Sequence, residues 1–250
     1  MRSTADDPSL AGAAGLVYAG VAYVAFLVSI FWLVLFLIDA PISKTIDSGS
    51  STGVVGATLD VVLIAAFGIQ HSVMARDGFK ARLTRLLPAF AERSTYVLSS
   101  AIVLGIVLAG WQPLPATIWR VEGLAAELIV AVFAAGVLIA VAATFMINHF
   151  DFTGLRQPWL RSRGRSYTPL AFQERWLYRY IRHPIVLGFF VAFWVTPHMT
   201  VGHLLFAVTA TVYLWVGTLF EERDLRSGIP GYDDYRSRVS AVIPIPRRLR

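Results

Sequence analysis

The sequence predicts an all-α fold, a polytopic transmembrane helical bundle with four spans, a C-terminal helical hairpin and both termini in the cytoplasm. Three observations predict this fold. Of the 250 residues, 56% are hydrophobic and only 15% are charged, whereas soluble domains carry about 25% charged residues. The apolar residues form runs long enough to cross a bilayer. The lysines and arginines lie between these runs, and their number alternates from one connection to the next.

The four spans are the apolar runs at 16–38, 54–73, 95–111 and 124–147. A helix needs about 20 apolar residues to cross the hydrocarbon core. We interpret the first run as a retained span, because no small-residue cleavage site follows it. A segment that mixes aromatic and charged residues, 172–181, is predicted to be an interfacial amphipathic helix.

The hairpin consists of the short apolar run 185–196 and the longer run 201–220. The first run is too short to cross untilted, and it ends at Pro197, which cannot continue a helix interior. The tip of the hairpin therefore lies either inside the bilayer or at the far interface.

The connections alternate between few and many basic residues. One lysine or arginine lies in each of the segments 39–53 and 112–123, and none lies in the hairpin tip. Five lie in segment 74–94, seven in segment 148–184 and seven in the tail after residue 220. Basic loops stay in the cytoplasm, so both termini are predicted to be cytoplasmic.

One domain, 1–250, is predicted, because no repeat or linker interrupts the chain. The net charge of +6 follows from these basic loops and indicates no nucleic-acid partner. The absence of cysteine excludes disulfides, cysteine-ligated zinc, iron–sulfur clusters and a cysteine nucleophile.

Polar side chains collect where four of the helices end on the cytoplasmic side. Ionisable groups at this depth are costly and often serve function. The candidates are Gln70, His71, Asn148, His149, Asp151, Arg182, His183, Glu221 and Glu222.

These residues allow two kinds of site, a metal site and a site for a charged cofactor. A metal is weakly indicated, because no two histidines stand four residues apart on one helix, and we predict no metal ligands. Glu221 and Glu222 are adjacent and point in different directions on a helix. That arrangement favours separate contacts with a cationic group, while the arginines suit a carboxylate.

The hairpin carries a recognisable pattern. The run 182–188 (RHPIVLG), the pair Glu221 and Glu222, and the later Gly231, Tyr232 and Tyr235 resemble membrane methyltransferases related to isoprenylcysteine carboxyl methyltransferase and phospholipid methyltransferase. The resemblance covers about residues 180–246. It implies that S-adenosylmethionine is held by Arg182, His183, Pro184, Gly188, Glu221, Glu222 and Tyr235. Val186 stands where that group usually has tyrosine.

A second resemblance extends over nearly the whole chain. The runs 70–76 (QHSVMAR), 92–98 (ERSTYVL), 148–157 (NHFDFTGLRQ) and 196–203 (TPHMTVGH) look like the methanethiol S-methyltransferase family, which is grouped with NnrU-like membrane proteins. This resemblance implies methylation of methanethiol to dimethyl sulfide and, in part, of hydrogen sulfide to methanethiol. It implies a bacterial inner membrane protein in the lipid bilayer, with its site toward the cytoplasm. It leaves the oligomeric state open.

The implied reaction needs a thiolate, because thiols are much weaker nucleophiles. Our first candidate base is His149, with Asp151 to orient it, and His71 is the second. Glu221 and Glu222 would hold the amino or ribose groups of the cofactor, and Arg182 and His183 its carboxylate or adenosine. Further substrate-site candidates are Gln70, Tyr96, Asn148 and Arg156.

Two alternatives remain from the sequence. One is a methyltransferase that acts on a prenylated cysteine or a lipid headgroup. The other is a non-enzymatic NnrU-like protein that binds haem through His71, His149 or His183.

Overall fold

Five helices in residues 8–244, the part of the chain described by this computed structural model, are long and apolar enough to cross a membrane. They are α1 (Pro8–Leu37), α2 (Gly53–Met74), α4 (Glu92–Gly110), α5 (Gly123–Ile147) and α9 (Val201–Gly228). The polytopic helical bundle is therefore confirmed, whereas the orientation in the membrane stays a prediction.

The hairpin contains the short helix α8 (Pro184–Trp194) and the long helix α9. Eleven helical residues span about 16 Å, roughly half of the hydrocarbon core. After α8 the chain continues in an extended stretch to strand β2 (His198–Thr200). This strand pairs antiparallel with β1 (Thr117–Arg120). This two-stranded sheet, which the all-α prediction did not contain, holds the hairpin tip against the α4–α5 connection.

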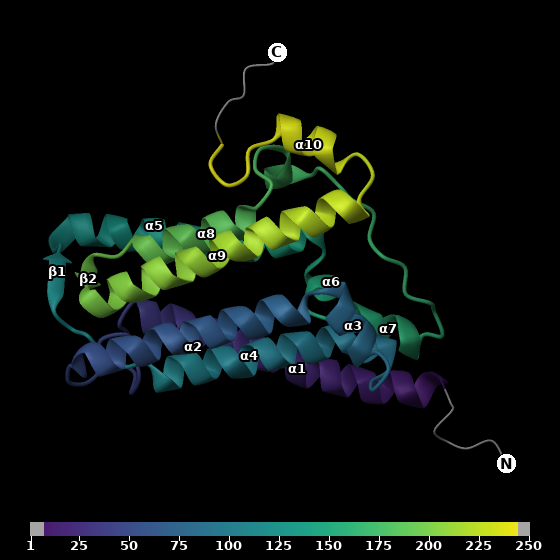
Figure 1. Ribbon diagram of the computed structural model, residues 1–250, viewed down its shortest axis with the longest axis horizontal. Helices are drawn as coiled ribbons and strands as arrows, with labels where there is room; N and C mark the ends of the chain where they lie inside the picture. The colour runs from purple at the N-terminus through teal and green to yellow at the C-terminus, as the bar shows by residue number, and fades with distance from the viewer. Residues whose placement is uncertain (1–7, 245–250) are drawn as a thin grey trace.

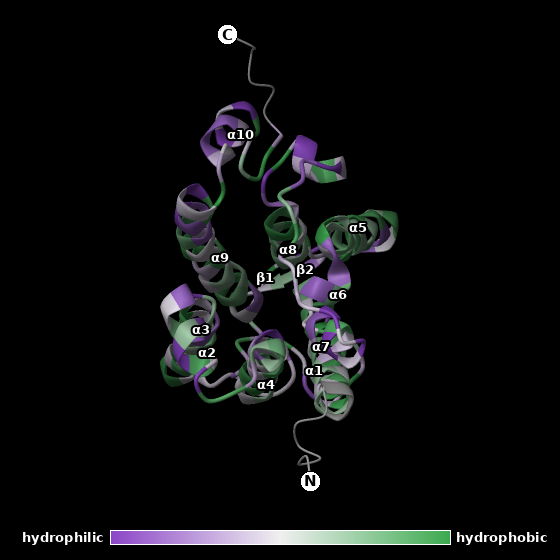
Figure 2. Ribbon diagram, turned by 90° about the vertical axis from the view of Figure 1, so that its right-hand side faces the viewer, coloured by the Kyte–Doolittle hydropathy of each residue, from purple (hydrophilic) through white to green (hydrophobic). Residues whose placement is uncertain are grey.

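The helices form two groups of three (Figures 1 and 2). In one group α1 and α2 pack against α4, and in the other α5 and α9 pack against α8. Gly188 on α8 allows close packing on α5, because a Cβ there would come within 2.5 Å of the Ala140 amide nitrogen. The groups meet where Tyr213 of α9 lies over Gly68 of α2.

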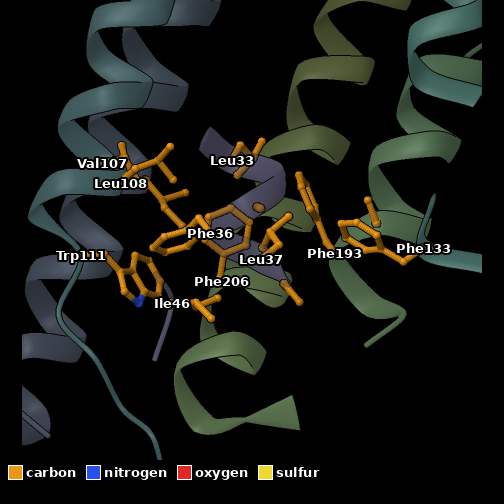
Figure 3. Close-up of a cluster of buried hydrophobic side chains, with 14 residues drawn as sticks. Leu33, Phe36, Leu37, Ile46, Val107, Leu108, Trp111, Phe133, Phe193 and Phe206 are labelled. Carbon is orange, nitrogen blue, oxygen red and sulfur yellow. The ribbon is translucent and has the colours of Figure 1, made fainter. Parts of the chain in front are cut away.

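A core of large apolar side chains joins the two groups near the β-sheet (Figure 3). It includes Phe36 from α1, Leu108 from α4, Phe193 from α8 and Phe206 from α9. The Phe36 ring lies edge-on to Trp111, with 5.9 Å between the centroids. We call this end of the bundle the β end.

Short elements collect at the opposite end, which we call the polar end (Figure 1). They are α3 (Asp77–Leu83), the 3-10 turn Ala89–Ala91, α6 (His149–Phe152), α7 (Arg156–Ser162), the 3-10 turn Trp176–Arg179 and α10 (Tyr232–Arg238). Each long connection rich in lysine and arginine lies here, as the alternating charge count requires.

The predicted amphipathic helix at 172–181 is wrong. Only one 3-10 turn forms, at Trp176–Arg179. Trp176 has a φ of 52°, which lies outside the right-handed helical region. The following backbone is held extended by the tail, since the amides of Arg182 and His183 donate to the carbonyls of Ser240 and Ala241, both at 2.9 Å.

Candidate functional site

A buried ion pair ties the start of α8 to α9 at the polar end. Two guanidinium nitrogens of Arg182, Nε and Nη2, lie 2.6 and 2.5 Å from Oε1 of Glu222. Arg236 of α10 donates to the other oxygen of Glu222 at 3.0 Å. Arg182 also donates to the carbonyls of Arg236 and Val239. Glu222 is therefore neutralised by the protein, and the donors of Arg182 are used to hold the tail.

Glu221 is the freer carboxylate of the predicted pair. Its side chain is 56% exposed, against 13% for that of Glu222. Its nearest cationic partner is the Nδ1 atom of His183, 3.5 Å away. It lies close enough to interact electrostatically with Tyr96 of α4, Tyr213 of α9 and Tyr178. The charge of Glu221 thus acts on phenols from both groups of helices.

His183 lies between the two glutamates. Its Nε2 atom is 3.0 Å from Glu222 Oε1, and its Nδ1 atom faces Glu221. Burial lowers the pKa of His183, but hydrogen bonds and charge from Glu221 and Glu222 outweigh burial, so that its pKa is raised above 6.5. Burial and the nearby Glu221 likewise raise the pKa of the Tyr178 phenol. Both shifts reflect the negative potential of this site.

Three other residues of the predicted cofactor set serve the local fold. Tyr235 is buried with Tyr232 and donates its hydroxyl to the Tyr178 carbonyl at 2.6 Å. Pro184 is buried in the first turn of α8, where its fixed φ suits a helix start. Gly188 faces α5 and is not brought to the carboxylates. Of that set, Glu221 has the exposed charged side chain that can meet a ligand, and the buried His183 holds it from behind.

His71 is linked to two hydroxyl groups of α4. Its Nε2 atom lies 2.5 Å from the Tyr96 hydroxyl, and its Nδ1 atom lies 3.1 Å from Ser100 Oγ. Ser100 donates its own proton to the Tyr96 carbonyl at 2.8 Å. The Arg93 guanidinium lies 4.9 Å from the centre of the Tyr96 ring. The second candidate base is therefore part of a defined polar network with Tyr96 and Ser100 of α4.

His149, the first candidate base, lies in a different environment. Nε2 is 3.0 Å from the Tyr23 hydroxyl, and Nδ1 is 2.8 Å from Thr144 Oγ1. The ring stacks on Phe145 with 4.2 Å between centroids, and burial lowers its pKa. The structure thus ties His149 to α1 and α5 rather than to the acidic residues.

Asp151 does not orient His149. Its carboxylate pairs with Arg156 at 2.9 Å and with the side-chain amide of Gln157 at 3.3 Å. Asn148 accepts a hydrogen bond from the Asp151 amide and so caps α6. Asn148, Asp151 and Arg156, which the sequence placed in the site, are thus engaged with one another around α6 and α7.

Gln70 is the remaining substrate-site candidate. Its amide nitrogen lies 2.9 Å from the Met74 sulfur, and its Oε1 atom is buried without a hydrogen-bond partner among residues 8–244. A buried unpaired acceptor is costly, and such a group next to His71 is available to a bound donor.

Several residues of the site were missed by the sequence analysis. Tyr213 precedes Glu221 by eight residues, a spacing that places both on one face of a helix, so the sequence could have indicated it. Ser100, Tyr178 and Arg236 carried no such signal, because their contacts with His71, Tyr235 and Glu222 join distant segments.

The histidines proposed as haem ligands, His71, His149 and His183, each use both ring nitrogens in the contacts above. Axial ligation would require one of these interactions to break, so the geometry counts against the haem alternative. Across residues 8–244, no three histidine, aspartate or glutamate side chains are grouped to hold a metal ion.

Comparison with known proteins identifies the family. Residues 61–224 match the family described as NnrU protein. Methanethiol S-methyltransferase of Mycobacterium tuberculosis is 44% identical over 93% of this chain and 97% of its own length. Methanethiol S-methyltransferase 2 of Bradyrhizobium diazoefficiens is 45% identical over 92% of this chain and 89% of its own length.

More distant similarity is found to Nurim of Pan troglodytes, at 29% identity over 67% of each chain. No solved structure matches the chain significantly. The family match and the similarity over nearly the full length show that this chain belongs to the NnrU protein family and, within it, to the group of the methanethiol S-methyltransferases.

Proposed function

We propose that the protein is an S-adenosylmethionine-dependent methyltransferase that converts a small thiol to its methyl thioether, with methanethiol as acceptor and dimethyl sulfide as product. Hydrogen sulfide is a second acceptor. The names of the full-length relatives support the acceptor. The observation that carries the proposal is the exposed Glu221 carboxylate, whose negative charge acts on phenols from both helix groups.

The chemistry of these residues fits the proposed cofactor. S-adenosylmethionine supplies, when bound, a methyl group activated on a sulfonium sulfur. Its amino group and sulfonium are both cationic, and carboxylates and aromatic faces attract cations. Glu221 would bind the amino group, because Glu222 is already neutralised. Tyr96, Tyr178 and Tyr213 would border the sulfonium and exclude water from it.

The polar end would face the cytoplasm of a bacterial inner membrane in this proposal. The basic connections at this end follow the positive-inside rule, and the methyl donor is a cytosolic compound. The acceptor is small and apolar, so it can reach the site from the bilayer between the helices. A site sheltered from water also limits hydrolytic side reactions.

The first experiment measures dimethyl sulfide in headspace gas above purified protein given S-adenosylmethionine and methanethiol. Parallel samples receive hydrogen sulfide or a farnesylated cysteine. We expect products from the two small thiols only. Turnover of the farnesylated cysteine but not of methanethiol would show that a prenylated cysteine, and not a small thiol, is the acceptor. Cofactor binding without turnover of any acceptor would contradict the proposed activity.

The second experiment measures cofactor binding by calorimetry in the Glu221→Gln variant. Removing the charge is expected to weaken binding by about 10-fold or more, as loss of a charge-assisted hydrogen bond does. Glu127→Gln is the matched control, since Glu127 is an exposed carboxylate near the β end of α5. Equal affinity in the two variants would remove Glu221 from the binding site.

A further inference from the structure

We infer that Tyr96, not a histidine, touches the thiol, and that His71, oriented by Ser100, completes a proton relay behind it. This inference rests on the proposed function and adds the identity of the proton acceptor. It is carried by the hydrogen bonds of three side chains on α2 and α4, of which only Tyr96 also borders the proposed position of the sulfonium.

The hydrogen bonds assign the tautomer of His71. A serine hydroxyl has one proton, and Ser100 donates it to the Tyr96 carbonyl. Ser100 Oγ can therefore only accept from His71, so the imidazole proton is on Nδ1. The Nε2 atom then carries the lone pair, and it accepts the hydroxyl proton of Tyr96 across 2.5 Å.

In this tautomer the oxygen of Tyr96 can still accept a hydrogen bond from a second donor, such as a thiol. A phenol oxygen that donates its proton to an imidazole gains negative character. The Arg93 guanidinium over the same ring favours that charge. His71 itself is enclosed by Phe67, Tyr213 and Tyr96, whose ring centroids lie 5.4, 6.1 and 4.9 Å away. Both nitrogens of His71 are already engaged by Tyr96 and Ser100, whereas Tyr96 Oη accepts no other hydrogen bond in the described part of the chain, so we place the thiol on Tyr96 Oη.

The position of Tyr96 relative to the cofactor-binding carboxylate supports this role. Tyr96 and Tyr213 both interact electrostatically with Glu221 and with each other. In the described part of the chain the Tyr213 hydroxyl forms no hydrogen bond, and its oxygen is not fully buried. Tyr96 and Tyr213 both lie against the His71 ring, with centroids 4.9 and 6.1 Å from it, so an acceptor held at Tyr96 Oη would lie on the side of the network that faces α9.

The proposed step balances protons and electrons. The S–H proton of methanethiol moves to Tyr96 Oη as the Tyr96 proton moves to His71 Nε2, which becomes an imidazolium. The sulfur electron pair forms the new bond to the methyl carbon. The old carbon–sulfonium bond breaks, and its electron pair stays on the donor sulfur. His71 then returns its proton through Tyr96 to water.

The test compares the pH dependence of kcat/KM for methanethiol in wild type, Tyr96→Phe and His71→Gln. Without the relay only pre-formed thiolate reacts. In both variants kcat/KM should be about 100-fold or more below the wild-type value near neutral pH, and it should rise about 10-fold per pH unit as the pH approaches the pKa of methanethiol. Charged or titratable groups that face the relay are Arg76, Glu92, Arg93, Tyr213 and Glu221, and all are unchanged in these variants.

The matched control is Tyr18→Phe. It removes a hydroxyl that bonds Thr95, the residue before Tyr96, at 3.0 Å. It is expected to keep the wild-type profile. Variant profiles parallel to wild type would overturn the relay, whereas failure of the wild-type protein to methylate methanethiol would overturn the proposed function instead.

A second readout needs neither activity nor a stable Tyr96 variant. Nitrogen-15 spectra of histidine-labelled wild-type protein, with His71→Gln to assign the signal, should show His71 neutral, protonated on Nδ1 and unprotonated on Nε2. A signal for the opposite tautomer, or for an imidazolium at neutral pH, would overturn the inference.

Discussion

Arg182 and Glu222 form a pair whose side chains are only 5% and 13% exposed, with 2.5 Å between Nη2 and Oε1. The pair joins the first residues of the hairpin to α9, forty positions further along the chain. Since Arg182 also holds two carbonyls of the tail, one guanidinium fixes α8, α9 and the segment after α10. The pair therefore positions Glu221, the residue directly before Glu222 on α9.

Replacing Arg182 by methionine is expected to destabilise the protein strongly. The change keeps the length of the side chain but leaves Glu222 with fewer partners, and removing one member of a buried pair costs about 3–5 kcal/mol. Denaturant unfolding in detergent measures the loss. Arg226→Met is the control, because Arg226 and Asp233 form an exposed pair and such pairs contribute little. Equal losses in both variants would contradict the role given to Arg182.

His183 is expected to give stability that depends on pH. Its pKa is raised in the folded protein above 6.5, so its contribution is complete below about pH 6.5 and is lost as the pH rises through the folded pKa. The difference in unfolding free energy between wild type and His183→Gln should therefore shrink as the pH rises. A constant difference from about pH 5 to about pH 9 would contradict this assignment.

Gly188→Ala is expected to destabilise the contact between α5 and α8. An added Cβ would lie 2.5 Å from the Ala140 amide nitrogen and 2.6 Å from the Gly136 oxygen, and overpacking of this kind costs about 1–3 kcal/mol. Gly217→Ala is the matched control on α9, since a Cβ there meets no atom within 4 Å. Alanine in a helix interior is favoured by about 0.5–1 kcal/mol. Thermal unfolding should therefore move in opposite directions for the two variants.

The sequence predicted the helices well because their cause is local. An uninterrupted apolar run must satisfy its own backbone in a bilayer, and only a helix does so within one segment. The helix expected at 172–181 was mispredicted because the chain after its single 3-10 turn pairs with Ser240 and Ala241 through Arg182 and His183, a long-range contact that no local pattern contains.

The site was predicted in part for the same reason. Glu221 and Glu222 share a motif, but only the structure distinguishes them, because Arg182 and Arg236 reach one and not the other. Asp151 was paired with His149 from proximity in sequence. Residues two apart on a helix face different directions, and the structure gives them separate partners.

His149→Ala is expected to reduce stability and to leave turnover per folded molecule unchanged. Its ring connects Tyr23 of α1 with Thr144 of α5 and stacks on Phe145, so its removal takes a hydrogen-bond partner from the Tyr23 hydroxyl and leaves a cavity. Loss of a large buried side chain costs about 2–5 kcal/mol.

His71→Gln should show the opposite pattern, with a large loss of turnover at neutral pH and a smaller loss of stability. Glutamine keeps most of the volume and can still hydrogen-bond Tyr96, but it cannot accept a proton as imidazole does. Turnover is measured per cofactor-binding molecule, so that unfolded protein does not count. Loss of turnover in His149→Ala, together with retained turnover in His71→Gln, would return the role of base to His149.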